Sequence, residues 1–211
     1  MPRRTAIRSE HLRRALAQEA ARLMAEHGVG DFGLAKRKAA ERYGVTEGSM
    51  LPKNVEIEAA LAEYQRLFGG DSHVESLTAQ RRAALAAMQL LAEFQPRLVG
   101  PVLAGTATEH ASVQLHVFAD SPEAASFHLM DHGIGYEVTA RRVRMSADRV
   151  LSQPVLCFEM DDHAIDATVF PGDGIRQAPV SPVDGRPMRR ADLAQVEELL
   201  GCDQARPAIS V

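Results

Sequence analysis

Two groups of histidines have the residue types and spacing that could bind a metal ion. His128 and His132 are four residues apart on an expected helix, so both side chains would share one face, as in many zinc sites. Histidines in a last helical turn also interact favourably with the helix dipole, and this capping role is favoured here. His110 and His116 flank an expected strand, and Asp166 lies on another expected strand. Since the sequence sets no distance among these three residues, we assign no metal ligand.

The short motifs of the chain exclude several enzyme classes. There is no G-x-x-x-x-G-K-[ST] sequence and therefore no P-loop, and there is no G-x-S-x-G hydrolase elbow. Gly28, Gly30 and Gly33 match the G-x-G-x-x-G dinucleotide fingerprint, but they follow an expected helix rather than a strand. They therefore indicate a connection between two helices. Cys157 and Cys202 do not make a disulfide framework.

Residues 1–95 have the apolar periodicity of helices. Asp31 is expected to cap the second helix, and Ser72 with Glu75 forms an S-x-x-E capping box at the start of the fourth. The segment Val45–Lys53 contains glycine and proline and indicates a loop. The expected helices are Ala6–His27, Phe32–Tyr43, a helix capped by Asn54 that ends at Gly69-Gly70, and a helix from Ser72 to Phe94.

After Pro96 the pattern changes, and several segments have the residue types or the alternation of strands. The strand candidates are Leu98–Ala104, Ser112–Phe118, Tyr136–Val143, Val150–Phe158 and Ala164–Phe170, and helices are expected from Pro122 to His132 and over Ala191–Leu200. We therefore expect an α+β fold. A helical region, residues 1–95, would precede a domain over residues 96–211 with a small mixed or antiparallel sheet. The helix that ends at Phe94 is expected to pack on this sheet.

The segment Leu98–Asp120, LVGPVLAGTATEHASVQLHVFAD, resembles the active-site segment of the polymerase-β-type nucleotidyltransferase superfamily. The superfamily pattern is G-S, a short gap, often G-T, and then S-D-x-D-L on a strand. Gly100-Pro101, Gly105-Thr106 and Ala111–Leu115 occupy these places here. The segments FGLAKRKAAERYGV, LPKNVEIEAALAEYQRLF and SPVDGRPMRRADLAQVEELL extend the resemblance to small proteobacterial nucleotidyltransferase-like proteins. These are sometimes named UDP-N-acetylmuramate–alanine ligase, although this chain has no P-loop for the ATP of a ligase.

The resemblance implies a nucleotide site and two-metal chemistry. Nucleotidyl transfer of this kind uses two divalent ions held by strand carboxylates, and the glycine turn lets backbone N–H groups approach phosphates. The implied nucleotide-binding residues are Gly100, Pro101, Gly105 and Thr106. Ser112 and Gln114 stand where both strand carboxylates would be, and their alternation predicts one shared face. The candidate for the remaining acid is Asp166, with Glu159 second.

Serine and glutamine supply only neutral oxygens, which hold hard cations poorly. We therefore expect a nucleotidyltransferase-like protein without standard two-metal catalysis that binds a nucleotide or has a regulatory or interaction role. One alternative is an active nucleotidyltransferase with Mg²⁺ or Mn²⁺ on rearranged ligands, Glu109, His116 and Asp166. Another is a nucleic-acid-binding module that uses the basic N-terminal helices.

Charge is unevenly distributed along the chain. The formal net charge is −4, yet residues 1–100 carry +3 and residues 101–211 carry −7. The N-terminal excess includes the run Lys36-Arg37-Lys38, which could contact phosphates, although a solvated helix face is the favoured explanation. The longest nearly apolar stretch, Ala83–Leu91, is far shorter than a membrane span. With two cysteines and no apolar signal segment, we expect a cytoplasmic protein without membrane contact.

Overall fold

The computed structural model describes residues 2–45 and 50–204, with side chains from Ser9 to Asp203. Part of the expected loop Val45–Lys53 and the side chains of the first arginines lie outside the described residues. By their contacts, the residues form two compact units. One comprises 1–73, 108–110 and 182–184, and the other comprises 74–107, 111–181 and 185–211. The units thus divide at 73–74, whereas the sequence pattern had suggested 95–96.

The first unit is built on three helices, α1 (Pro2–His27), α2 (Phe32–Arg42) and α3 (Asn54–Tyr64). Asp31 caps α2 as expected, because its Oδ1 accepts the Leu34 backbone N–H at 2.6 Å. The buried residues that join these helices are Leu16, Ala20, Met24, Ala35, Ala39, Ile57 and Leu61. Arg37 and Lys38, from the basic run, are exposed on α2.

The start of α4 (Gly70–Leu90) differs from the sequence prediction. The Ser72–Glu75 capping box would begin the helix after Gly69-Gly70, but α3 continues through a π-helical turn, Gln65–Gly69, directly into α4. At this junction Gly70 has a positive φ of 52°, a conformation that glycine adopts readily. Ser72 is therefore an internal residue of the helix, and α4 ends near Leu90 before a short 3₁₀ turn, Ala92–Phe94.

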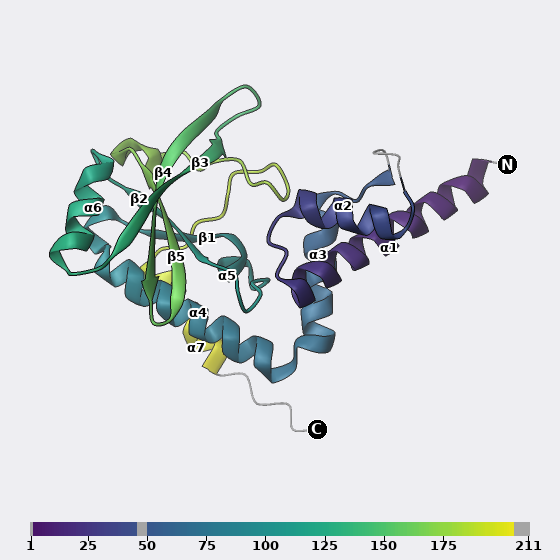
Figure 1. Cartoon of the computed structure of the whole chain (residues 1–211), viewed down its shortest axis with the longest axis horizontal. Helices are drawn as coiled ribbons and strands as arrows, with labels where there is room; N and C mark the ends of the chain where they lie inside the picture. Colours follow the sequence, from purple (N-terminus) through teal and green to yellow (C-terminus); the bar gives the residue numbers. More distant parts are fainter. Residues whose placement is uncertain (1, 46–49, 205–211) are drawn as a thin grey trace. The chain divides into compact units, whose positions relative to one another are not determined.

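A five-stranded mixed sheet forms the centre of the second unit (Figure 1). Its order is β1-β2-β5-β4-β3, and β2 with β5 is the parallel pair among antiparallel neighbours. The strands are β1 (Arg97–Val99), β2 (Val113–Phe118), β3 (Tyr136–Arg144), β4 (Val150–Met160) and β5 (His163–Phe170). The sequence prediction of an α+β fold is therefore confirmed.

Three helices and two shorter turns complete this unit. They are α5 (Gly100–Ala104), α6 (Pro122–Asp131), α7 (Leu193–Gln204), the Ala92–Phe94 turn and a second 3₁₀ turn, Gly172–Arg176. The expectation of a strand over Leu98–Ala104 is wrong beyond Val99. Gly100 has a φ of 72°, which ends the strand, and Pro101 is favoured in a first helical turn because it needs no N–H partner there.

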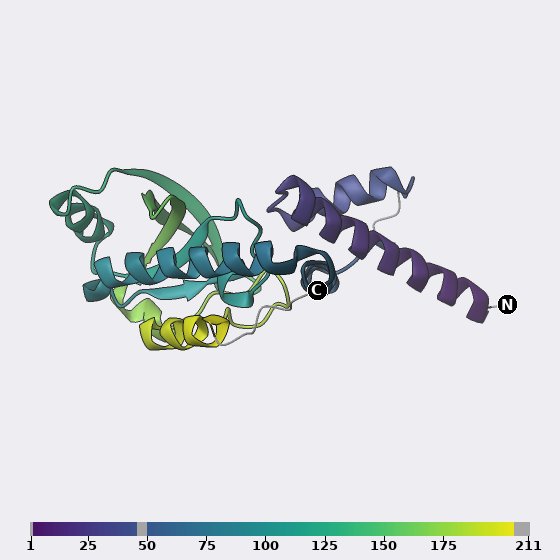
Figure 2. The ribbon, with the colours of Figure 1, turned by 90° about the horizontal axis from the view of Figure 1, so that it is seen from below.

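One face of the sheet is covered by helices and forms the core. Leu115 and Leu156 project from it onto Ala84, Ala87 and Met88 of α4, as the sequence predicted for this helix. Figure 2 shows α4 and α7 running beside each other, and the buried Arg81–Asp203 ion pair joins them at 2.6 Å. In the described part of the chain, no helix is long and apolar enough to cross a membrane.

Candidate functional site

The face of the sheet opposite α4, called the polar face below, carries polar side chains beside the buried rings of Phe118 and Phe170. Because side chains alternate along β2, Ser112, Gln114 and His116 lie on this face, while Val113 and Leu115 enter the core. Gln114 is paired in register with Asp166 on the parallel strand β5. The three residues singled out from the sequence, Ser112, Gln114 and Asp166, therefore meet on adjacent strands.

Asp166 is held by two donors that converge on one carboxylate oxygen. The Ser112 hydroxyl donates to Asp166 Oδ2 at 2.9 Å, and Arg141 Nη2 donates to the same oxygen at 2.7 Å. Arg141 reaches this position from β3, on the far side of β4. The Asp166 side chain is 18% exposed, so it is a mostly buried anion neutralised by a guanidinium.

Gly100 allows the backbone after β1 to approach Gln114 closely. A Cβ built on Gly100 would lie 2.7 Å from Gln114 Oε1, closer than such atoms can approach, and the positive φ also favours glycine. Gly100 therefore borders the same site as Ser112, Gln114 and Asp166.

The other residues implied to bind nucleotide have different surroundings. Pro101 has no N–H to offer a phosphate. The N–H groups of Gly105 and Thr106 both donate to the Pro101 carbonyl and thereby close α5, the latter at 3.0 Å. In this arrangement, these two backbone donors serve the helix end rather than a ligand.

His116 and Arg190 form a second, more buried part of the polar face. Arg190 Nε donates to His116 Nδ1 at 3.1 Å, which leaves the imidazole proton on Nε2. Burial and the positive charges of Arg190 and Arg141 lower the pKa of His116 to about 3. The Arg190 guanidinium also stacks over Phe118 and Phe170, at 5.0 and 5.5 Å from the ring centroids. His116 is therefore a neutral acceptor at physiological pH.

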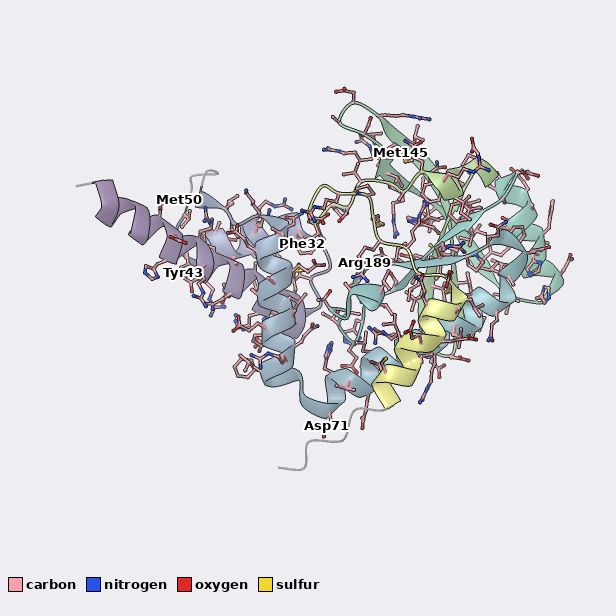
Figure 3. The ribbon with its side chains drawn as sticks, turned by 180° about the vertical axis from the view of Figure 1, so that it is seen from behind. Phe32, Tyr43, Met50, Asp71, Met145 and Arg189 are labelled. Carbon is pink, nitrogen blue, oxygen red and sulfur yellow. The ribbon has the colours of Figure 1, made fainter. Side chains whose placement is uncertain are left out.

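The position of Arg190 follows from the pairing of the C-terminal segment with β1. Leu98 and Ala191 exchange backbone hydrogen bonds of 2.8 and 2.9 Å, and both side chains are buried in the core. Alternation then turns Arg97 and Arg190 to the polar face. Figure 3 labels the preceding residue, Arg189, on this segment, and Met145 just beyond β3.

The residues on this face do not fit a pair of divalent ions. Two-metal sites need several anionic oxygens. Ser112, Gln114 and Asp166 together supply one carboxylate, and that carboxylate already pairs with Arg141. Among the described residues, no group of three or more His, Cys, Asp or Glu side chains could hold a metal. His116, in the alternative ligand set with Glu109, has its Nδ1 engaged by Arg190.

The i, i+4 histidines on α6 are also engaged in hydrogen bonds. His128 Nδ1 pairs with Glu93, and its Nε2 contacts the Leu90 carbonyl at 2.7 Å. His132 Nδ1 contacts the His128 carbonyl at 2.8 Å, in the last turn of the helix. The His132 contact lies at the end of its own helix, as in the capping interpretation, whereas His128 contacts the last residue of α4.

Sequence reasoning did not single out Arg141, Arg190 or Arg97 for this site. The alternation of Tyr136–Val143 would place Arg141 on one face of its strand, but it does not say which strand lies beside it. Arg190 lies outside any strand, and its place depends on one isolated bridge at Leu98. No local signal in the sequence could have brought these three arginines together.

We predict that Gly100→Ala displaces the Gln114 side chain. The added methyl group would overlap the amide, which is the movable end of a flexible side chain. Gly105→Ala is the matched control, since its φ of 80° imposes similar backbone strain but its Cβ would have only ordinary contacts. Both variants should lose about 1–2 kcal/mol of stability. Only Gly100→Ala should shift the Gln114 side-chain amide resonances in NMR spectra, and unchanged resonances would contradict the placement.

Comparison of the chain with protein-family models, with curated proteins and with solved structures yields no match in any of the three.

Proposed function

We propose that this chain is a nucleotidyltransferase-like protein that binds the phosphates of a nucleotide on the polar face of its sheet, without two-metal transfer. The supporting observation is the meeting of Ser112, Gln114 and Asp166 beside Gly100, the arrangement that the sequence resemblance implied. We expect binding without catalysis, because the Asp166 carboxylate pairs with Arg141 and is therefore a poor ligand for the metal ions that transfer would need. Such a protein would sense a nucleotide or present it to a partner.

The proposal is tested by the melting temperature with ATP, CTP, GTP or UTP, each in EDTA and with Mg²⁺ or Mn²⁺. A ligand at 100 times its Kd adds about 2.7 kcal/mol. For a chain of this size, that corresponds to a rise of about 5–10 °C. We expect at least one nucleotide to raise the melting temperature equally in EDTA and in metal. No rise with any nucleotide, or transfer of a labelled nucleotide in the presence of metal, would refute the proposal.

Restoring the two carboxylates should create a metal site. The double variant Ser112→Asp and Gln114→Asp would set three carboxylates on adjacent strands, where their repulsion favours a divalent cation. We expect Mn²⁺ to bind this variant at least about tenfold more tightly than the original chain, which is about 1.4 kcal/mol. Calorimetric titration with Mn²⁺ measures the difference.

A third change provides the control for this experiment. Adding Asp166→Asn to the double variant should return Mn²⁺ binding toward its original level, because the three side chains then share only two charges. Equal Mn²⁺ affinity in the double and triple variants would show that Asp166 does not share a site with positions 112 and 114.

A further inference from the structure

The polar face carries more positive charge than its ion pair neutralises. Arg97, Arg141 and Arg190 all project to this face, and Asp166 is the carboxylate that pairs with one of them. By register, Glu137 and Glu159 lie on this same face, where both side chains are exposed to solvent. The arginines also affect their neighbours, since burial and Arg97 lower the pKa of Arg190 to about 10. A multiply charged anion would relieve this repulsion.

Among the described residues, three hydrogen bonds hold Arg190 in the fold, while its buried Nη2 has no hydrogen-bond partner. Its Nη1 donates to the carbonyls of Gly174 and Ile175 at 3.1 Å each, and its Nε donates to His116. The two phenylalanine rings below it complete a packed environment. Arg190 therefore supplies fixed charge and holds the C-terminal segment on the sheet.

Arg141, by contrast, is held in place by Asp166, but only part of its hydrogen-bonding capacity is engaged. Its guanidinium has five N–H donors in a fork that fits a phosphate. In the described part of the chain, one side-chain acceptor engages it, Asp166 Oδ2. The Arg141 side chain remains 40% exposed, so the rest of the fork can reach a ligand. Ser112 bonds the same Asp166 oxygen and thereby restrains the carboxylate that orients the fork.

We propose that Arg141 binds the phosphate chain of the ligand in place of metal ions, and that Asp166 and Ser112 are positioning residues that orient its guanidinium. This inference rests on the proposed function, and it specifies the ligand as an inorganic or nucleoside polyphosphate taken up without a divalent cation. The nearby charges of Arg97 and Arg190 add long-range attraction.

Calorimetric titration in EDTA tests this assignment, with tripolyphosphate and the most stabilising nucleoside triphosphate as probes. We expect Arg141→Ala to weaken binding of both probes at least about tenfold, which corresponds to about 1.4 kcal/mol. Arg141→Lys should recover only part of the loss, because lysine keeps the charge without the fork. The matched control is Arg142→Ala, which removes an exposed charge from the opposite face of β3 and should change affinity less than twofold.

The direction in which Asp166→Asn changes the affinity for the probes distinguishes a positioning role of Asp166 from simple charge repulsion. If Asp166 only repelled an anionic ligand, removing its charge would tighten binding. If it orients Arg141, the variant should bind more weakly, and this is the expected result. Melting temperatures of all variants identify any loss that comes from unfolding.

The outcomes separate this inference from the function on which it rests. If the original chain binds neither probe, the proposed function fails. If it binds them but Arg141→Ala binds equally well, or Arg142→Ala loses as much, the role of Arg141 is refuted while nucleotide binding stands. Tighter binding by Asp166→Asn would refute the positioning role.

Discussion

Replacing His116 by glutamine is expected to flatten the loss of stability that acid causes. The folded chain holds the pKa of His116 at about 3, whereas the unfolded chain restores it to about 6.5. Between these values the unfolded state binds more protons. The free energy of unfolding therefore falls as the pH decreases from about 6.5 toward about 3. From pH 6.5 to pH 4.5, His116 should account for about 2 kcal/mol of the loss.

The largest physical cause is burial, because a charged imidazolium would lose its hydration, and the positive charge of Arg190 adds to the cost of protonation. A proton on Nδ1 of His116 would face the Nε–H of Arg190, next to the buried ring of Phe170. Glutamine can still accept from Arg190 through its side-chain oxygen but does not titrate. Urea denaturation of both proteins at each pH measures the difference, with His132→Gln, at the exposed histidine that follows α6, as the control. Parallel pH profiles for His116→Gln and the original chain would contradict this account.

Asp203→Ala is expected to cost about 3–5 kcal/mol of stability, a large part of what a domain has. The Arg81 and Asp203 side chains are 7% and 13% exposed, and their ion pair joins α4 to α7 at 2.6 Å. Removing the carboxylate leaves a buried guanidinium with a weaker bond, at 3.3 Å, to the Val102 carbonyl. The variant should also loosen α7, whose last turns depend on this contact.

Two comparisons isolate this effect in urea denaturation. The double variant Arg81→Met and Asp203→Leu should regain most of the lost stability, because apolar side chains of similar size need no charge partner. Arg13→Ala breaks a solvent-exposed pair with Glu56 and should cost less than about 1 kcal/mol. A loss below 1 kcal/mol for Asp203→Ala would show that the pair is not part of the buried structure.

Local patterns predicted most elements of this fold. Period-two alternation identified β2, β3, β4 and β5 within a few residues. In β2, β4 and β5 one side of the alternation enters the core, whereas β3 is mostly exposed. The cap at Asp31 was also predictable, because its donor, the Leu34 N–H, lies only three residues along the chain. The exceptions are the strand expected to continue beyond Val99 and the capping box at Ser72. In both, a glycine with positive φ decided the path of the chain.

For the candidate site too, local properties were predictable from the sequence and contacts between distant segments were not. The sequence by itself determined that Ser112 and Gln114 share a face and that both lack the charge a divalent ion needs, because alternation and side-chain chemistry are local properties. Only the tertiary structure decided that Asp166 lies beside Gln114 and that Arg141 crosses from β3 to neutralise it. Strand order and register come from packing between distant segments, and the sequence of each strand is compatible with several partners.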